Sequence, residues 1–279
     1  MRIMETKLAS KTGDPDTCED RYCLTEHYAC VIDGATDVSG KRYGNRTSGQ
    51  VIASALEEGV RALPPGLGIE QLMKQLNERL IQTYQELGMY DEIQEHPHSI
   101  PSASMALYSP QRHQVWMIGD CQCMLDGELY SNEKKVDSIT AYTRSMLLES
   151  EVLRGKTIAE LMESDPSRGV IRPLIQAQYV MQNTAQPSQY GYVAVTGFEF
   201  DLGQIKMVDV PAATRELVLA SDGYPLLRPT LAESEAELQR ILETDPLCFR
   251  EYKLAKGLQA GNESFDDRTY VRLELPARG

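Results

Sequence analysis

The sequence predicts an α+β fold in which antiparallel sheets are covered by helices. Strand-like runs outnumber helical ones, and the helices come in adjacent pairs instead of alternating regularly with strands. The chain of 279 residues is 42% hydrophobic and 25% charged, an ordinary composition for a globular protein. Because no internal repeat, low-complexity tract or linker divides it, we expect a single domain over residues 1–279.

The N-terminal part of the chain contains three predicted strands and two predicted helices. Residues Met1 to Ala9 predict a first strand, and Arg21 to Thr25 with Tyr28 to Asp33 predict a hairpin. Apolar residues recur at helical spacing over Thr47 to Val60 and again over Ile69 to Leu87. These two segments are therefore expected to be amphipathic helices, each with one buried face.

A turn-prone segment, Glu95 to Pro101, precedes a group of strands. The apolar and β-branched content predicts three strands in quick succession, Ser102 to Tyr108, Gln114 to Gly119 and Cys121 to Leu125. The dipeptide Asp126-Gly127 then favours a tight hairpin turn.

Helical patterns dominate the next stretch of the chain. Three helices are predicted, interrupted by Gly155 and by Asp165-Pro166: Ile139 to Leu153, Thr157 to Met162 and Val170 to Gln182. Because this stretch separates two groups of strands, we expect an insertion or flap at about residues 144–189.

Strand patterns return in the C-terminal part of the chain. The predicted strands are Gly191 to Thr196, Ile205 to Val210, Glu216 to Ser221 and a last one at Thr269 to Leu275. Between the last two, a helix is predicted over Leu231 to Glu243 and another around Phe249 to Leu258.

The composition argues against several classes of partner. A net charge of −13 repels phosphate backbones, so no nucleic-acid partner is expected. No apolar stretch approaches the ~18 residues needed to cross a bilayer, and the first residues lack a signal-peptide pattern. We therefore expect a cytoplasmic protein without a membrane partner. The six cysteines lack a repeated C-x-x-C spacing, which indicates reduced, buried thiols and no zinc site.

Four short apolar runs each carry an aspartate at one end. Three runs lead into Asp33, Asp120 and Asp222, and the fourth follows Asp266. Each run has the length and composition of a buried strand, and a glycine stands beside three of these aspartates. Carboxylates at the ends of neighbouring strands would meet at one place, where they repel one another and are costly to desolvate. The pattern therefore indicates a site for a hard divalent cation.

An acidic pair, Glu19-Asp20, precedes the first of these aspartates. The order along the chain resembles that of the metal-dependent type-2C protein phosphatase family: the acidic pair, Asp33-Gly34, Gly119-Asp120, Ser221-Asp222-Gly223 and Asp266-Asp267-Arg268-Thr269. The dipeptide Asp33-Gly34 is a weak signal by itself, because Asp-Gly is primarily a turn dipeptide. The ordered set is far more specific, and it covers nearly the whole chain.

This resemblance implies a fold and a metal centre. The fold is a central antiparallel β-sandwich flanked by helices, in four layers α-β-β-α. The centre holds two ions, Mn²⁺ or Mg²⁺, in a cleft at one edge of the sandwich. By resemblance, Asp33 bridges both ions, the Gly34 carbonyl is a further ligand, and Asp222 and Asp266 complete the shell of one ion.

The resemblance also assigns positions around the two ions to the remaining acidic residues. The resemblance places Glu19 on the other ion, largely through water, and Asp20 in the same acidic shell. Asp120 matches the family position that, together with Asp222, serves a third and weaker ion.

The activity implied is metal-dependent hydrolysis of phosphomonoesters, foremost phosphoserine and phosphothreonine in proteins, by a water that bridges the two ions. Two divalent ions ~3.5 to 4 Å apart can acidify such a water, hold the phosphoryl oxygens and align the attack. The expected partner is a phosphoprotein or a small phosphorylated substrate. Two alternatives stay open: a small-molecule phosphatase on the same fold, and a catalytically weak pseudophosphatase that acts as a regulatory binding module.

The sequence departs from the family pattern where the substrate phosphate is bound. Family members often carry an arginine four residues before the acidic pair, and this chain has Pro15 there. The nearby cations that can substitute for this phosphate contact are Lys11, Arg21, Lys41, Arg42 and Arg46. Arg42 and Arg46 are favoured, because they follow the Asp33 loop closely. The residue after Asp-Gly, often a histidine proposed as a general acid, is Ala35. The nearby Asp37 is interpreted as a solvated loop residue.

Overall fold

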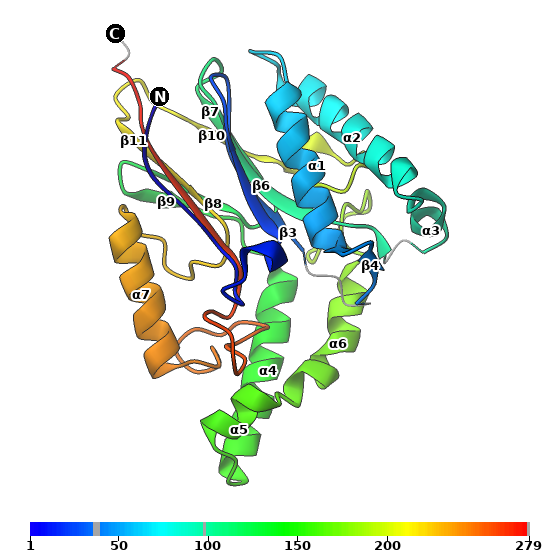
Figure 1. Cartoon of the computed structure of the whole chain (residues 1–279), viewed down its shortest axis with the longest axis vertical. Helices are drawn as coiled ribbons and strands as arrows, with labels where there is room; N and C mark the ends of the chain where they lie inside the picture. The colour runs from blue at the N-terminus through cyan, green and yellow to red at the C-terminus, as the bar shows by residue number, and fades with distance from the viewer. Residues whose placement is uncertain (36–39, 97–98, 278–279) are drawn as a thin grey trace.

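The computed structural model describes residues 1–35, 40–96 and 99–277, and two five-stranded sheets form its centre (Figure 1). The first sheet has the order β1 (Arg2–Ala9), β12 (Arg268–Glu274), β11 (Glu216–Ala220), β8 (Gln122–Leu125) and β9 (Glu128–Tyr130). The second has the order β10 (Lys206–Asp209), β7 (Gln114–Ile118), β6 (Ala103–Ser109), β3 (Ala29–Gly34) and β2 (Asp20–Leu24). All neighbouring strands in both sheets pair antiparallel.

The two sheets pack against each other through one apolar core. Val31 of β3 and Ala106 of β6 belong to the same buried cluster as Leu219 of β11 and Val271 of β12. Every residue of β6 is buried, which explains why its sequence lacks the alternation of a half-exposed strand. The expected central sandwich of antiparallel sheets is therefore confirmed.

Helices α1 (Ser48–Ala62) and α2 (Ile69–Glu86) cover the outer face of the second sheet (Figure 1). Val51 and Leu76 from these helices share a buried cluster with Trp116 of β7. Helix α1 begins with a capping box, in which the side chains of Thr47 and Gln50 satisfy each other's backbone N–H groups. A short helix, α3 (Tyr90–Glu95), follows α2 and was not expected from the sequence.

Helix α7 (Leu231–Thr244) covers the outer face of the first sheet (Figure 1). Its residues Leu238 and Ile241 pack with Val218 of β11 and Tyr270 of β12. With α1 and α2 on the opposite side, the layers follow the order helix, sheet, sheet, helix. The α+β fold class and its four layers are thus as predicted.

Three more helices lie at one end of the sandwich (Figure 1). They are α4 (Lys135–Leu153), α5 (Ile158–Glu163) and α6 (Ser167–Gln178). Together they overlap the stretch in which an insertion was expected. Smaller elements in the described part of the chain include the 3₁₀ turns Pro15–Thr17 and Leu202–Gln204 and the hairpin of β4 (Arg42–Tyr43) with β5 (Arg46–Thr47).

Two predicted elements are wrong. Residues 191–196 do not form a strand of either sheet, because only isolated bridges occur there, Val195 with Ala103 and Tyr192 with Gln182. Residues 249–258 do not form a helix. The Asp245 carboxylate accepts hydrogen bonds from the backbone N–H groups of Phe249, Arg250 and Glu251. Arg144 donates to the carbonyl oxygens of Leu247 and Leu254, which are then not available for helical hydrogen bonds.

Other expectations are met or lie beyond the described residues. Asp126 and Gly127 both have positive φ, 45° and 89°, at the turn between β8 and β9, as the Asp-Gly signal predicts. All six cysteines are free and buried. Asp37, and part of the turn expected at residues 95–101, lie outside the described residues. Within the described ranges, no helix combines the length and apolar character that a bilayer crossing requires.

Candidate metal centre

One cavity of about 1100 Å³ collects acidic residues from both sheets. Its walls include six of the residues predicted from the motif order: Glu19, Asp33, Gly34, Asp120, Asp222 and Asp266. The seventh, Asp20, is 1% exposed and lies beneath them. Residues up to 247 positions apart in the sequence therefore surround one space, as the clustering of strand ends predicted.

Asp20 and Asp33 face each other on adjacent strands. They are paired in the register of β2 and β3, and Asp33 is in turn opposite Ser104 of β6. The hydroxyl of Thr269, at the start of β12 in the other sheet, donates a hydrogen bond of 2.9 Å to Oδ2 of Asp20. This bond joins the two sheets directly beside the cavity.

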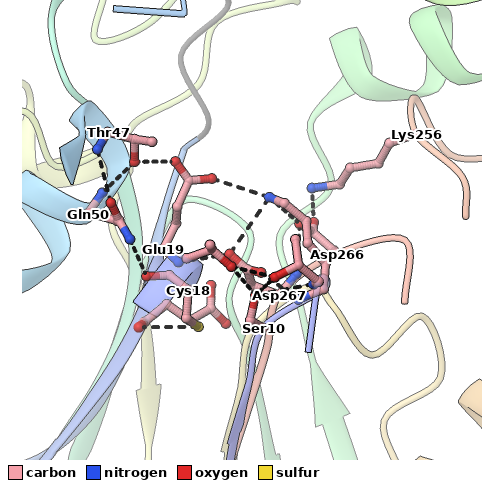
Figure 2. A network of polar contacts seen from close by, with 12 residues as sticks. Ser10, Cys18, Glu19, Thr47, Gln50, Lys256, Asp266 and Asp267 are labelled. Atoms are coloured by element: carbon pink, nitrogen blue, oxygen red, sulfur yellow. Dashed lines mark hydrogen bonds and ion pairs between the residues drawn. The ribbon is translucent and has the colours of Figure 1, made fainter. Parts of the chain in front are cut away.

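The chain after Asp33 passes very close to the beginning of α1. A Cβ atom on Gly34 would lie 2.3 Å from the carbonyl oxygen of Gly49 and 2.7 Å from that of Glu19, so only glycine fits there. The hydroxyl of Thr47, the residue that caps α1, donates a 2.6 Å hydrogen bond to Oε1 of Glu19 (Figure 2). The start of the helix thereby holds the Glu19 carboxylate at the cavity wall.

Asp222 and Asp266 come from neighbouring strands of the first sheet. Asp222 follows β11, and Asp266 precedes β12, which pairs with β11. A Cβ atom on Gly223 would lie 2.1 Å from the carbonyl oxygen of Asp267, so this glycine permits the close approach of the two strand ends. Oδ1 of Asp222 is buried and has no hydrogen-bond partner among the described residues.

Asp120 is held in place by two partners. The Ser104 hydroxyl donates to Oδ1 of Asp120, and Lys134 forms an ion pair of 2.6 Å with Oδ2. Gly119 has a φ of 77°, and a Cβ atom there would lie 2.2 Å from the Ser104 hydroxyl oxygen. Burial raises the pKa of Asp120, but Lys134 and Ser104 outweigh it and leave that pKa below its usual value.

Asp267, which the sequence analysis did not assign, joins three segments around the cavity. Its carboxylate accepts 2.8 Å hydrogen bonds from the backbone N–H groups of Lys11 and Glu19 (Figure 2). The Lys11 ammonium lies 3.3 Å from Oε2 of Glu19, 3.7 Å from Oδ2 of Asp267 and 3.8 Å from Oδ1 of Asp266. The ammonium group of Lys256 forms an ion pair with the other oxygen of Asp266 (Figure 2).

Like charges and burial shift the titration of the two central aspartates. Burial, and then the charges of Asp222, Asp20 and Asp120, hold the pKa of Asp33 well above its usual range. Burial is also the largest cause that raises the pKa of Asp20 to about 7, with further contributions from Asp267 and Asp222. An additional positive charge in the cavity would lower both pKa values.

The oxygen atoms that could act as metal ligands at the cavity suit a hard cation, although they do not already surround an ion-sized space. They are carboxylate oxygens together with the backbone of Gly34, the ligand type that Mg²⁺ and Mn²⁺ prefer. Oδ1 of Asp222 is free to act as a metal ligand, because it has no hydrogen-bond partner among the described residues. Over the described ranges, however, no three acidic, cysteine or histidine side chains already stand close enough to enclose an ion. The residues fit a divalent cation, provided that Lys256 leaves Asp266.

The predicted phosphate-binding arginines lie away from this cavity. Arg42 and Arg46 are exposed on the β4–β5 hairpin, and neither contributes to the cavity wall. Arg42 donates to the carbonyl oxygen of Asn45. Pro15, at the family's arginine position, opens a 3₁₀ turn. The basic residues that line the cavity are Lys11, Lys134, Arg144, Arg168, Lys253 and Lys256. The two arginines donate to the backbone carbonyl groups of Leu247 and Ala255. The wall formed by the described residues contains no histidine and no cysteine.

Comparison with known proteins gives likenesses of structure only. No family model and no curated protein matches the sequence. A bacterial serine phosphatase is similar at 12% identity and a TM-score of 0.49, with 99% of each chain covered. The catalytic domain of the serine/threonine phosphatase PstP in complex with two manganese ions is similar at 15% identity and a TM-score of 0.48, with 98% of this chain and 97% of that chain covered.

A third similar structure is the serine/threonine phosphatase Stp1 from Staphylococcus aureus, at 13% identity and a TM-score of 0.48, with 99% of this chain and 98% of that one covered. At these identities and TM-scores the likenesses carry no family, site or activity to this chain. The order of layers and strands is established by the structure itself. The order helix, sheet, sheet, helix agrees with the four layers that the order of the acidic motifs implied.

Proposed function

We propose that this protein hydrolyses phosphomonoesters, foremost phosphoserine and phosphothreonine in proteins, with the aid of Mn²⁺ or Mg²⁺. One observation carries the proposal: acidic side chains from the ends of strands in both sheets converge on one cavity, where a buried oxygen of Asp222 lacks a partner among the described residues. Such a concentration of carboxylates is costly unless cations neutralise it. In the proposed site, Asp33, Asp222 and Asp266 hold the cations, with the Gly34 carbonyl.

The residues around these ligands position them. Thr47 holds Glu19, Ser104 and Lys134 hold Asp120, and Thr269 holds Asp20. These bonds fix Glu19 and Asp120 at the cavity wall and the buried Asp20 behind it before substrate arrives, which lowers the cost of organising the site. When bound, divalent cations would polarise the phosphoryl oxygens and supply water as a nucleophile near neutral pH.

Side-chain nucleophiles give no competing mechanism at this cavity. Its described wall contains no cysteine or histidine. Burial raises the pKa of Cys121, next to Asp120 in the sequence, well above its usual value, which keeps that thiol protonated. The chemistry that fits is attack by water, with the carboxylates acting through the cations they hold.

The test is hydrolysis of p-nitrophenyl phosphate and of a phosphothreonine peptide by the purified protein. We expect turnover with millimolar Mn²⁺ and its loss on addition of a chelator. Asp222→Asn should lower kcat/KM by at least about 100-fold. Removing a residue that only hydrogen-bonds a metal ligand already lowers activity by up to about 100-fold, and removing the ligand itself should cost no less. Asp91→Asn, the same change on the exposed first turn of α3, should leave turnover unaltered.

One feature favours a second candidate, a regulatory binding module. Lys11 and Lys256 already neutralise Asp266 and Asp267, so the cavity is partly charge-balanced by the chain's own residues. Absence of turnover on both substrates and on a panel of phosphorylated metabolites at millimolar Mn²⁺ would favour this candidate. Turnover that survived chelation would instead contradict the metal-dependent mechanism.

A further inference from the structure

Three lysines reach the acidic cavity from separate segments of the chain. Lys11 follows β1, Lys134 caps the beginning of α4, and Lys256 lies in the connection between α7 and β12. Each forms at least one ion pair with a carboxylate of the cavity. These lysines bring positive charge to the cavity, where the sequence had favoured Arg42 and Arg46 as the phosphate contact.

Lys11 and Lys134 are each held by several groups. Lys11 pairs with Glu19, Asp266 and Asp267, and its side chain is 23% exposed. Lys134 pairs with Asp120, lies 5.3 Å from the centre of the Tyr192 ring and is 17% exposed. These contacts make both residues structural counterions of the cavity wall.

Lys256 differs from both in its contacts and its exposure. Lys11 has three ion-pair partners and Lys134 has one together with the Tyr192 ring, whereas among the described residues Lys256 has one ion-pair partner, Asp266, and no ring contact. Its side chain is also the most exposed of the three, at 40%. Its ammonium group can therefore leave one carboxylate and turn toward the solvent-filled part of the cavity without breaking other ion pairs. Figure 2 shows the side chain extending from its own segment toward Asp266.

The backbone that carries Lys256 is firmly anchored. The fully buried Arg144 of α4 donates to the carbonyl oxygens of Leu247 at 2.6 Å and Leu254 at 3.1 Å. Arg168 of α6 donates to the carbonyl oxygen of Ala255, the residue before Lys256. The helices at the end of the sandwich thus fix the position of Lys256 while its side chain retains room to move.

We propose that Lys256 binds the phosphoryl group of the substrate, taking the role that the absent arginine at position 15 leaves open. The inference rests on the proposed function. A divalent cation on Asp266 and the ammonium group of Lys256 repel each other, so a cation on Asp266 displaces the lysine. The displaced ammonium group of Lys256 can then form a charged hydrogen bond with the dianionic phosphoryl group of the substrate that enters the cavity.

The experiment compares Lys256→Met and Lys256→Arg with the control Lys74→Met. Lys74 lies on α2, outside the cavity wall, and its side chain is 77% exposed. Calorimetry measures binding of inorganic phosphate to the Mg²⁺-loaded protein and, separately, binding of Mn²⁺ to the metal-free protein. Steady-state kinetics on p-nitrophenyl phosphate gives KM and kcat.

We expect Lys256→Met to weaken phosphate binding and raise KM by roughly 10-fold or more, the size of a lost charged hydrogen bond, with a smaller effect on kcat. Mn²⁺ should bind this variant at least as tightly as the wild type, because a competitor for Asp266 has been removed. Lys256→Arg should restore most of the phosphate affinity, and Lys74→Met should behave as wild type.

The two proposals fail in different ways. Phosphate affinity unchanged in Lys256→Met overturns the role of Lys256, even if metal-dependent turnover is present. Weaker Mn²⁺ binding together with a lower melting temperature would show a merely structural role and also overturn it. A wild type that binds phosphate through Lys256 but hydrolyses none of the substrates would retain the inference and overturn the proposed hydrolysis.

Discussion

The titration of Asp20 affects the stability of the metal-free protein. Its pKa is about 7 in the folded chain, against an ordinary value of 3.8, mainly because it is buried. Between these two pH values the folded state keeps a proton that the unfolded state has lost. The contribution of Asp20 to stability is therefore largest below about pH 4 and falls as the pH rises to about 7.

The variant Asp20→Asn isolates this effect, because asparagine can still accept the hydrogen bond from Thr269 but cannot ionise. In metal-depleted buffer, the melting temperature of Asp20→Asn relative to wild type should increase between pH 5 and pH 8 by at least about 2 °C. Thermal unfolding monitored by circular dichroism at several pH values measures this difference. A difference that does not change with pH would contradict the assigned titration, and Asp91→Asn provides the control.

At the same scale, the sequence predicted the acids that line the cavity and one of the three lysines that pair with them. Asp33, Asp222 and Asp266 could be identified because each follows or precedes an apolar run at a fixed position in an ordered pattern. Lys11 was a candidate because it is near the acidic pair in the sequence, but Lys134 and Lys256 were not, because each lies on a segment whose path is set by tertiary contacts. A lysine in a loop has the same sequence signal whether it is solvated or turned into a cavity.

Arg144 connects α4 to the segment between α7 and β12, which carries Lys256. It is fully buried and forms an ion pair of 2.8 Å with Asp165, besides its bonds to the carbonyl oxygens of Leu247 and Leu254. Removing it leaves a half-buried carboxylate and two carbonyl groups without their partner. The connection between α7 and β12 then loses its principal anchor.

Arg144→Met should therefore lower the free energy of unfolding by about 3 to 5 kcal/mol. Hydrogen exchange in residues 246–258 should accelerate more than exchange in the strands, because the anchor is local. Arg154→Met, at the exposed end of the same helix, should leave both measurements nearly unchanged. A uniform acceleration over the whole chain would show that Arg144 contributes only to global stability.

The elements with strong periodic patterns were predicted nearly to their ends. β3, α1, α2 and β12 differ from the expected segments by one or two residues, because burial of a single face dictates their spacing. The failures are of another kind. At residues 249–258 the apolar spacing suggested a helix, but Asp245 and Arg144, both distant from its centre, bind the backbone groups that a helix needs. Propensity is overridden there by specific side-chain contacts.

For the whole molecule, the cavity lies where the two sheets meet, so a bound cation should stabilise the sandwich. Asp33 belongs to the second sheet, whereas Asp222 and Asp266 belong to the first. A ligand present at 100 times its dissociation constant adds about 2.7 kcal/mol to the stability of the folded state. Saturating Mn²⁺ should accordingly raise the melting temperature by roughly 5 to 10 °C.

Differential scanning calorimetry with and without Mn²⁺ measures this shift. Asp33→Asn should abolish most of it, since that residue is the expected bridge between the ions. Asp91→Asn, which lies on the exposed face of α3, should keep the full shift. An equal shift in Asp33→Asn would place the stabilising cation elsewhere on this acidic chain.

The three lysines of the cavity offset only part of its negative charge. Lys11, Lys134 and Lys256 pair with Glu19, Asp120, Asp266 and Asp267, whereas Asp33 and Asp222 have no ion-pair partner among the described residues. In small metal-binding domains, folding and metal loading are one event. On the proposed function, these lysines would let the chain fold first and load metal later, so that the supply of divalent cations would control activity without unfolding the protein.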